Sequence, residues 1–302
     1  MGKRINRCIE LLEQDQAIYY DGPHSGHVLT AAQGRIDAAT WADYMNVGME
    51  HGAFDMAGLA EYMRGMVEAG PTRSGHRTPA VIVEAPVNGI DAAHVRHNAW
   101  QFRQILGRGV HGILLCQAES ADAVRAFVES CRYPHNTLGV DPKIPSPLAR
   151  MQGAIRAKDG GTDAAGQKLL GIGTRGRGSE ATAAPVWGLS VEDFMDRCDP
   201  WPLNPRGELL LGVKLESPEG VANCEEITAV PETRICRDRS GRPQPVARLP
   251  DYTARAFSKG DADGARPHPC RLPPAWRRLP AVLHRRQHHR ADRGGGAGRR
   301  RP

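Results

Sequence analysis

Long apolar runs are missing from this chain of 302 residues. No stretch approaches the roughly 18 consecutive apolar residues of a membrane-spanning helix, so we expect no membrane span. The first residues are basic and then acidic, without the apolar core of a secretion signal, and we therefore expect a cytoplasmic protein. The seven cysteines include no Cys-x-x-Cys pair, which argues against a zinc knuckle and suits a reducing compartment.

Acidic residues are scarce in one part of the chain only. Residues 232–302 hold 17 arginines and one lysine against six acidic residues, a net charge of +12. Because the whole chain carries +6, residues 1–231 carry −6. The charge pattern therefore indicates an ordinary acidic globular body at 1–231, joined to a strongly basic segment at 232–302.

The first 231 residues alternate between short apolar runs and amphipathic stretches. This alternation predicts parallel strands joined by helical crossovers, in either a barrel or a doubly wound sheet. The predicted strands cover residues 16–21, 44–49, 79–83, 110–116 and 209–215. The predicted helices cover residues 4–14, 37–43, 55–69, 91–106 and 120–131.

A glycine-rich segment at 171–176 has the spacing Gly-x-Gly-x-x-Gly. In a dinucleotide-binding protein this motif follows a strand and opens a helix. Here the apolar run before it is short, and the residues after it, Arg-Gly-Ser, do not predict a helix. We therefore do not interpret the segment as a dinucleotide site.

The last predicted strand ends in a single acid, Glu216. The next residues, Ser217, Pro218 and Glu219, suit a helix start, with a capping hydroxyl, a proline and an early acid. A carboxylate between a buried strand and a helix is typical of the catalytic end of a (β/α)8 barrel. The alternative is an acid that only solvates a strand end.

Three stretches together resemble the HpcH/HpaI aldolase/citrate lyase family. They are Val47-Gly-Met-Glu-His-Gly-Ala-Phe-Asp at 47–55, the strand, helix and Cys-Arg-Tyr-Pro at 109–134, and Gly-Val-Lys-Leu-Glu-Ser-Pro-Glu at 212–219. The resemblance covers about residues 15–231. It implies an α/β fold, a (β/α)8 TIM barrel that is incomplete here, with about five β/α units.

The resemblance also implies a chemistry. It implies a metal-dependent carbon–carbon lyase that cleaves a 4-hydroxy-2-oxo acid into pyruvate and an aldehyde. A divalent metal ion, Mg or Mn, is implied as cofactor, a small 2-oxo acid as ligand, and a homo-oligomer if the barrel is complete. Such a hard cation prefers carboxylate oxygens and stabilises an enolate as a Lewis acid.

Single positions follow from the same resemblance. Glu216 matches a metal ligand and His51 the catalytic base, although His51 also suits a simple strand-end histidine. Lys214 and Glu84 fall at substrate-binding positions, where the family has glutamine and arginine. Two aspartates of the family pattern are replaced by Gly48 and Gly107.

The resemblance stops after residue 231, before the strand that carries the family's second metal carboxylate. By composition, residues 232–302 are predicted to be disordered. One explanation is a basic tail that binds nucleic acid nonspecifically through phosphates. The other, which we favour because no linker intervenes, is a shift of reading frame near residue 232. The leading hypothesis is a lyase whose activity is doubtful in this chain; the alternatives are a non-catalytic barrel fragment and a basic-tailed binding protein.

Overall fold

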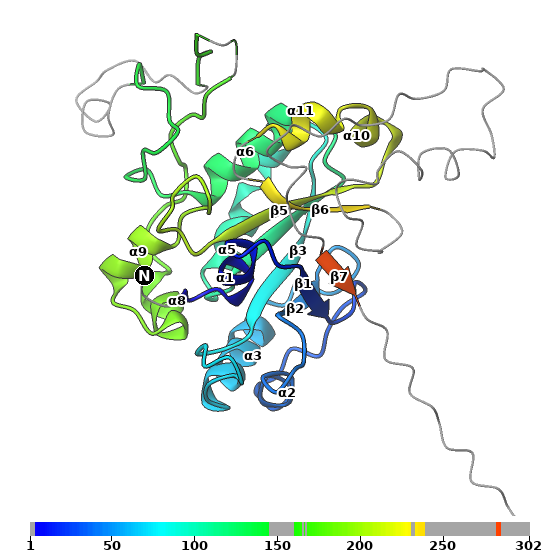
Figure 1. The fold of residues 1–302 in the computed structure, drawn as a ribbon, viewed down its shortest axis with the longest axis vertical. Coiled ribbons are helices and arrows are strands. Elements are labelled where there is room, and N and C mark those ends of the chain that lie inside the picture. Colours follow the sequence, from blue (N-terminus) through cyan, green and yellow to red (C-terminus); the bar gives the residue numbers. More distant parts are fainter. Residues whose placement is uncertain are drawn as a thin grey trace, which may run out of the picture.

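The computed structural model describes residues 4–144, 160–164, 166, 168–230, 233–238 and 282–284. Their strands form one parallel sheet in the order β6-β5-β4-β3-β2-β1-β7 (Figure 1). The strands are β1 (Ile18–Asp21), β2 (Tyr44–Gly48), β3 (Ala80–Asn88), β4 (Gly112–Cys116), β5 (Leu210–Leu215), β6 (Thr233–Asp238) and β7 (Val282–His284). All five predicted strands are therefore confirmed, and the sheet curls into part of a TIM-type barrel.

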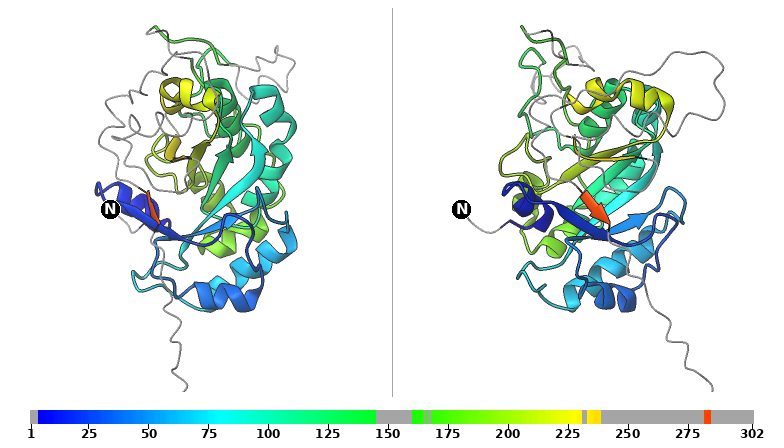
Figure 2. Two further views of the ribbon diagram at one scale, coloured as in Figure 1. Left: turned by 90° about the vertical axis from the view of Figure 1, so that its right-hand side faces the viewer. Right: turned by 45° about the vertical axis from the view of Figure 1, so that its right-hand side comes forward.

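Helices that connect the strands cover the outer side of the sheet (Figure 2), whereas α1, which precedes β1, packs against the inner face. They are α1 (Arg7–Leu12), α2 (Ala31–Asp37), α3 (Met56–Glu68), α4 (Ala92–His97), α5 (Ala99–Leu106), α6 (Ala121–Cys131), α8 (Glu180–Trp187), α9 (Val191–Arg197), α10 (Pro218–Ala222) and α11 (Cys224–Thr228). In the described part of the chain, none of them has the length and apolar character that crossing a bilayer requires.

Most helix starts follow from local capping. Ser120 caps α6, and Ser217 caps α10 with Pro218 in its first turn, as predicted. The helix predicted at 37–43 is wrong, because the side chain of Thr30 accepts a hydrogen bond from the Gln33 amide and starts α2 earlier. Thr-x-x-Gln is a capping-box pattern, so the sequence carried this signal.

Two apolar layers lie on opposite faces of the sheet. Side chains at odd-numbered positions of β2 to β5, such as Val83 and Val213, pack against the helices of the outer layer. Even-numbered ones, such as Ile82 and Leu114, pack on the inner face with Ile9 of α1. The period of two residues along each strand therefore decides which side chains point into the barrel.

Residues 232–302 contribute two strands that we did not predict, β6 beside β5 and β7 beside β1. Pairing at a sheet edge uses backbone donors and acceptors, so it needs no apolar alternation in the added strand. The other residues of this segment lie outside the described part of the chain. The predictions of disorder and of a reading-frame shift there stay predictions.

Candidate functional site

Strand pairing brings three polar side chains to the inner face of the sheet. The register aligns Gly48 with Glu84, Glu84 with Leu114, and Leu114 with Gly212. Two residues further on, Cys116 and Lys214 point to the same inner face, because side chains alternate along a strand. Cys116 ends β4 and Lys214 is the next-to-last residue of β5, so both lie at the carboxyl ends of their strands, where barrels of this type carry their chemistry, whereas Glu84 is at the middle of β3.

Lys214 is the centre of this cluster. Its ammonium donates to Glu50 Oε2, lies 3.0 Å from Glu216 Oε1 and 3.9 Å from Glu84 Oε2. Lys214 is 4% exposed and Glu84 is fully buried at 0%. One ammonium thus faces three carboxylates in a largely buried place, and we call these four residues the Lys214 cluster.

The environment of Lys214 keeps it charged. Burial alone would lower its pKa, but the carboxylates of Glu84, Glu50 and Glu216 outweigh burial and raise the pKa above its ordinary value. Burial, opposed by Lys214, raises the pKa of the Cys116 thiol. At neutral pH Lys214 is therefore an ammonium, and the neighbouring Cys116 is a protonated thiol.

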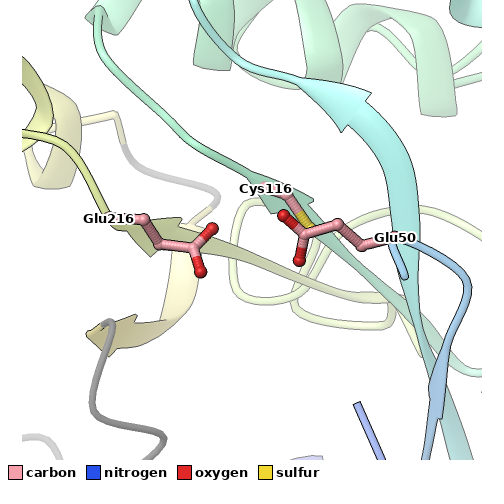
Figure 3. A group of neighbouring side chains, drawn as sticks. All are labelled: Glu50, Cys116 and Glu216. Carbon is pink, nitrogen blue, oxygen red and sulfur yellow. The ribbon is translucent and has the colours of Figure 1, made fainter. Parts of the chain in front are cut away.

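Glu50, Cys116 and Glu216 form a group with metal-ligating atoms. One ligand atom from each lies within 4.8 Å of the others. Figure 3 shows the carboxylates of Glu216 and Glu50 turned toward each other, with Cys116 beside Glu50. The backbone amide of Gln117 donates to Glu216 Oε2 at 3.2 Å, which helps to orient that carboxylate.

Two carboxylates suit a hard divalent cation, whereas a protonated thiol does not. The two facing carboxylates, Glu50 and Glu216, also share a single ammonium, that of Lys214. The competitor is Lys214 itself, because its ammonium contacts both Glu50 and Glu216. The donor set fits a divalent ion in which the lysine is displaced from one or both carboxylates.

A histidine from the first loop completes the buried side of the site. His24 Nδ1 lies 2.7 Å from Glu84 Oε1, and its Nε2 lies 3.2 Å from the hydroxyl of Tyr20. Gly48 makes this approach feasible, because a Cβ there would lie 1.9 Å from the His24 carbonyl oxygen. The replacement of a family aspartate by Gly48 therefore has a structural reason.

The predicted base, His51, lies at the rim of the cluster. Its side chain is 66% exposed, and its Nε2 is 3.7 Å from Glu50 Oε2. Glu84 and Lys214, predicted at substrate-binding positions, are buried beneath this rim. The structure thus brings Glu84, Lys214 and Glu216 together and leaves His51 open to solvent at their edge.

Sequence reasoning missed three members of the site: Glu50, Cys116 and His24. Glu50 directly follows the second predicted strand, and Cys116 ends the fourth. The rule that picked out Glu216, a polar residue at the carboxyl end of a strand, applies to both. His24 follows the Gly-Pro pair after the first strand, and its hydrogen bond with Glu84 spans 60 residues, so no local signal reveals it.

Comparisons with known proteins support the fold. No family model matches the chain, and no curated protein matches its sequence. A HpcH/HpaI aldolase/citrate lyase family protein from Burkholderia cenocepacia is 18% identical, with a TM-score of 0.50 over 76% of this chain and 66% of that chain. A HpcH/HpaI aldolase from Desulfitobacterium hafniense is 17% identical, with a TM-score of 0.48 over 76% of this chain and 64% of that chain.

The matched region spans a little under two thirds of those solved chains. At a sequence identity below 20%, the comparison shows similarity of the backbone fold only. In fold, the chain resembles the HpcH/HpaI aldolase/citrate lyase proteins, as an incomplete TIM barrel.

Proposed function

We propose that the Lys214 cluster is the site of a metal-dependent carbon–carbon lyase that acts on small 2-oxo acids, with Mg or Mn as its metal. The observation that carries the proposal is the pair of carboxylates, Glu50 and Glu216, that face each other at the carboxyl ends of parallel strands. The fold likeness supports the same reaction class.

Glu50 and Glu216 would hold the metal ion. When bound, the ion would act as a Lewis acid on the 2-oxo group and stabilise the enolate that carbon–carbon cleavage produces. Lys214 does not suit the other route to such chemistry, an imine with the substrate. Imine formation requires a neutral amine, and the raised pKa of Lys214 keeps it protonated.

A histidine at the edge of the Lys214 cluster would transfer the proton. His51 is accessible and lies beside Glu50, so it suits exchange of a proton with a substrate hydroxyl or with water. His24 is the second candidate, because its Nδ1 lies 2.7 Å from Glu84 Oε1, which orients the ring. Separate alanine variants of His51 and His24 distinguish the two: the base is the residue whose loss abolishes cleavage.

We expect low activity from this chain. The ammonium of Lys214 competes with the metal for Glu50 and Glu216. Glu84 adds a negative charge where the family has an arginine, which opposes the charge that develops on an enolate. Pyruvate release from 4-hydroxy-2-oxo acids should therefore be weak or absent, with or without Mg or Mn.

The test is a coupled pyruvate assay on two chains. One is the chain as it stands, and the other carries the alternative reading frame of its gene after residue 231. The second chain should show metal-dependent cleavage that Glu216→Gln removes. Metal-independent cleavage, or cleavage unaffected by Glu216→Gln, would contradict the proposed role of the carboxylates.

A further inference from the structure

A second pocket lies on the outer side of the barrel, away from the Lys214 cluster. Its volume is about 450 Å³, and its walls include Arg103, Arg108 and Arg177. The first two come from α5 and the turn after it, and the third from the glycine-rich segment that precedes α8. A cavity of this size suits a small-molecule ligand.

Within the part of the chain that the structure describes, the three arginines have no acidic partner. Within the described residues, no carboxylate lies at salt-bridge distance from any of them, whereas most other arginines of the body are paired. The Nε of Arg108 is moreover buried without a hydrogen-bond partner in that part of the structure. Arg103 lies in the last turn of α5, where a positive charge stabilises the negative end of the helix dipole. This accounts for the presence of Arg103 but not for that of Arg108 or Arg177.

The glycine-rich segment gives the pocket an open backbone wall. Gly176 and Gly178 line it, and a Cβ added to either would meet no atom within 4 Å. Contrary to the sequence-based expectation, a helix does follow, since α8 starts at Glu180. Its N-cap, Ser179, lines the pocket and makes no capping hydrogen bond with its side chain, while Glu180 itself is 5% exposed and accepts from the Gly178 amide.

Gly107 joins the two halves of the pocket. A Cβ at this position would lie 2.8 Å from Cβ of Ser179, so the end of α5 and the start of α8 meet closely only because residue 107 is glycine. Gly107 stands where the related family has an aspartate. The same substitution that removes an acid from the catalytic pattern therefore keeps a negative charge out of this pocket.

We propose that this pocket binds a phosphorylated small molecule. Three guanidinium groups provide planar pairs of donors that match phosphate oxygens. Trp100 forms a further wall; the residue is 46% exposed, and its ring packs edge-to-face on Phe54 with the ring centroids 5.7 Å apart. A phosphate ester with a flat ring, such as a nucleoside monophosphate, would use both the arginines and the tryptophan.

The pocket is separate from the proposed catalytic site. Arg108 precedes β4 and Cys116 ends it, so the two sites lie toward opposite ends of the same strand. Binding here is therefore independent of the proposed lyase chemistry, and either proposal can fail without the other.

The test is calorimetric titration of the full chain with AMP, pyrophosphate and adenosine, at low and at physiological ionic strength. We expect AMP and pyrophosphate to bind and adenosine to bind far more weakly. Because each guanidinium supplies charge-assisted hydrogen bonds, Arg108→Gln and Arg177→Gln should each weaken AMP binding by about ten- to hundredfold. Trp100→Ala should weaken AMP and leave pyrophosphate nearly unchanged.

The matched control is Arg206→Gln, which removes one charge from an exposed arginine outside the pocket. It should change the affinity for AMP less than twofold, and thermal unfolding should show that all variants are folded. Equal losses for Arg206→Gln and Arg177→Gln would show attraction to net charge only and overturn the proposal. Equal affinity for citrate and AMP, or no binding of AMP or pyrophosphate at millimolar concentration, would overturn it as well.

Discussion

Replacing Lys214 by methionine tests the electrostatics of the proposed catalytic site directly. The ammonium lies 3.0 Å from Glu216 Oε1 and 3.9 Å from Glu84 Oε2, and it also donates to Glu50. Methionine keeps most of the volume of the side chain but removes its charge. Three carboxylates would then face one another in a site where Glu84 is fully buried.

The expected cost is large. At an effective dielectric constant of about 20, two unit charges 4 Å apart interact by about 4 kcal/mol. Removing one partner from a buried ion pair typically costs about 3–5 kcal/mol. We therefore expect Lys214→Met to lower the free energy of unfolding by about 3–5 kcal/mol, measured by urea unfolding at neutral pH.

The pH of the measurement follows from the sign of the shift. The folded state raises the pKa of Lys214, so its contribution to stability is complete below the ordinary lysine pKa and is lost only as pH rises through the raised value. Measurements at pH 7 therefore detect the whole effect. Mn²⁺ should stabilise Lys214→Met more than the unmodified chain, because the ion replaces the missing positive charge between Glu50 and Glu216.

Lys168→Met is the matched control. Lys168 pairs with Asp122 at 2.8 Å, but both side chains are well exposed, so the expected loss is about 0–1 kcal/mol. A loss for Lys214→Met no larger than that of the control would refute the view that this ammonium compensates buried carboxylates. If Mn²⁺ stabilised Lys214→Met and the unmodified chain equally, this would refute the view that Lys214 and the metal compete for Glu50 and Glu216.

Three further predictions concern other parts of the molecule. Burial lowers the pKa of His111 to about 3, so stability should fall by about 1.4 kcal/mol per pH unit as pH drops from about 6.5 toward that value, and His111→Gln should remove this dependence in acid unfolding curves. Glu208→Ala should cost about 3–5 kcal/mol by urea unfolding, because the buried carboxylate accepts from the amides of Ile5 and Asn6 and pairs with Arg197; a loss below 1 kcal/mol would contradict this. In the pyruvate assay the chain as it stands should show little turnover with Mn²⁺, and robust turnover would show that one lysine does not exclude the metal.

The strands were predictable because most of them are short apolar runs that the fold buries on both faces. Val83, Ile113 and Val213 are all fully buried, and β4 and most of β5 are uninterrupted apolar runs, whereas β2 and β3 each carry one buried polar residue, Asn46 and Glu84, and β1 exposes Tyr19. Parallel pairing then followed from the helical spacers between them. The start of α2 was missed because the apolar pattern after Thr30 is weak, and the capping signal was the better guide.

The site was predictable only in part. Glu216 was visible as an acid at a strand end, and the resemblance added His51, Lys214 and Glu84. The convergence of Glu84 and Lys214 on Glu50 depends on the register between strands, and a shift of one residue would turn these side chains to the outer face. The contact of His24 with Glu84 depends on a loop path that no periodicity describes.

The attachment of α1 has a consequence for the order of events during synthesis. The amides of Ile5 and Asn6 bond to Glu208, more than 200 residues later in the chain. At about 5–20 residues per second, a ribosome needs roughly 10–40 s to reach that partner after α1 has emerged. Meanwhile β1 to β4 are all available and pair with their immediate successors. During this interval the Asn6 side chain can already bond to the His111 carbonyl, but the attachment of α1 over Tyr20 and Leu114 is complete only once Glu208 is available.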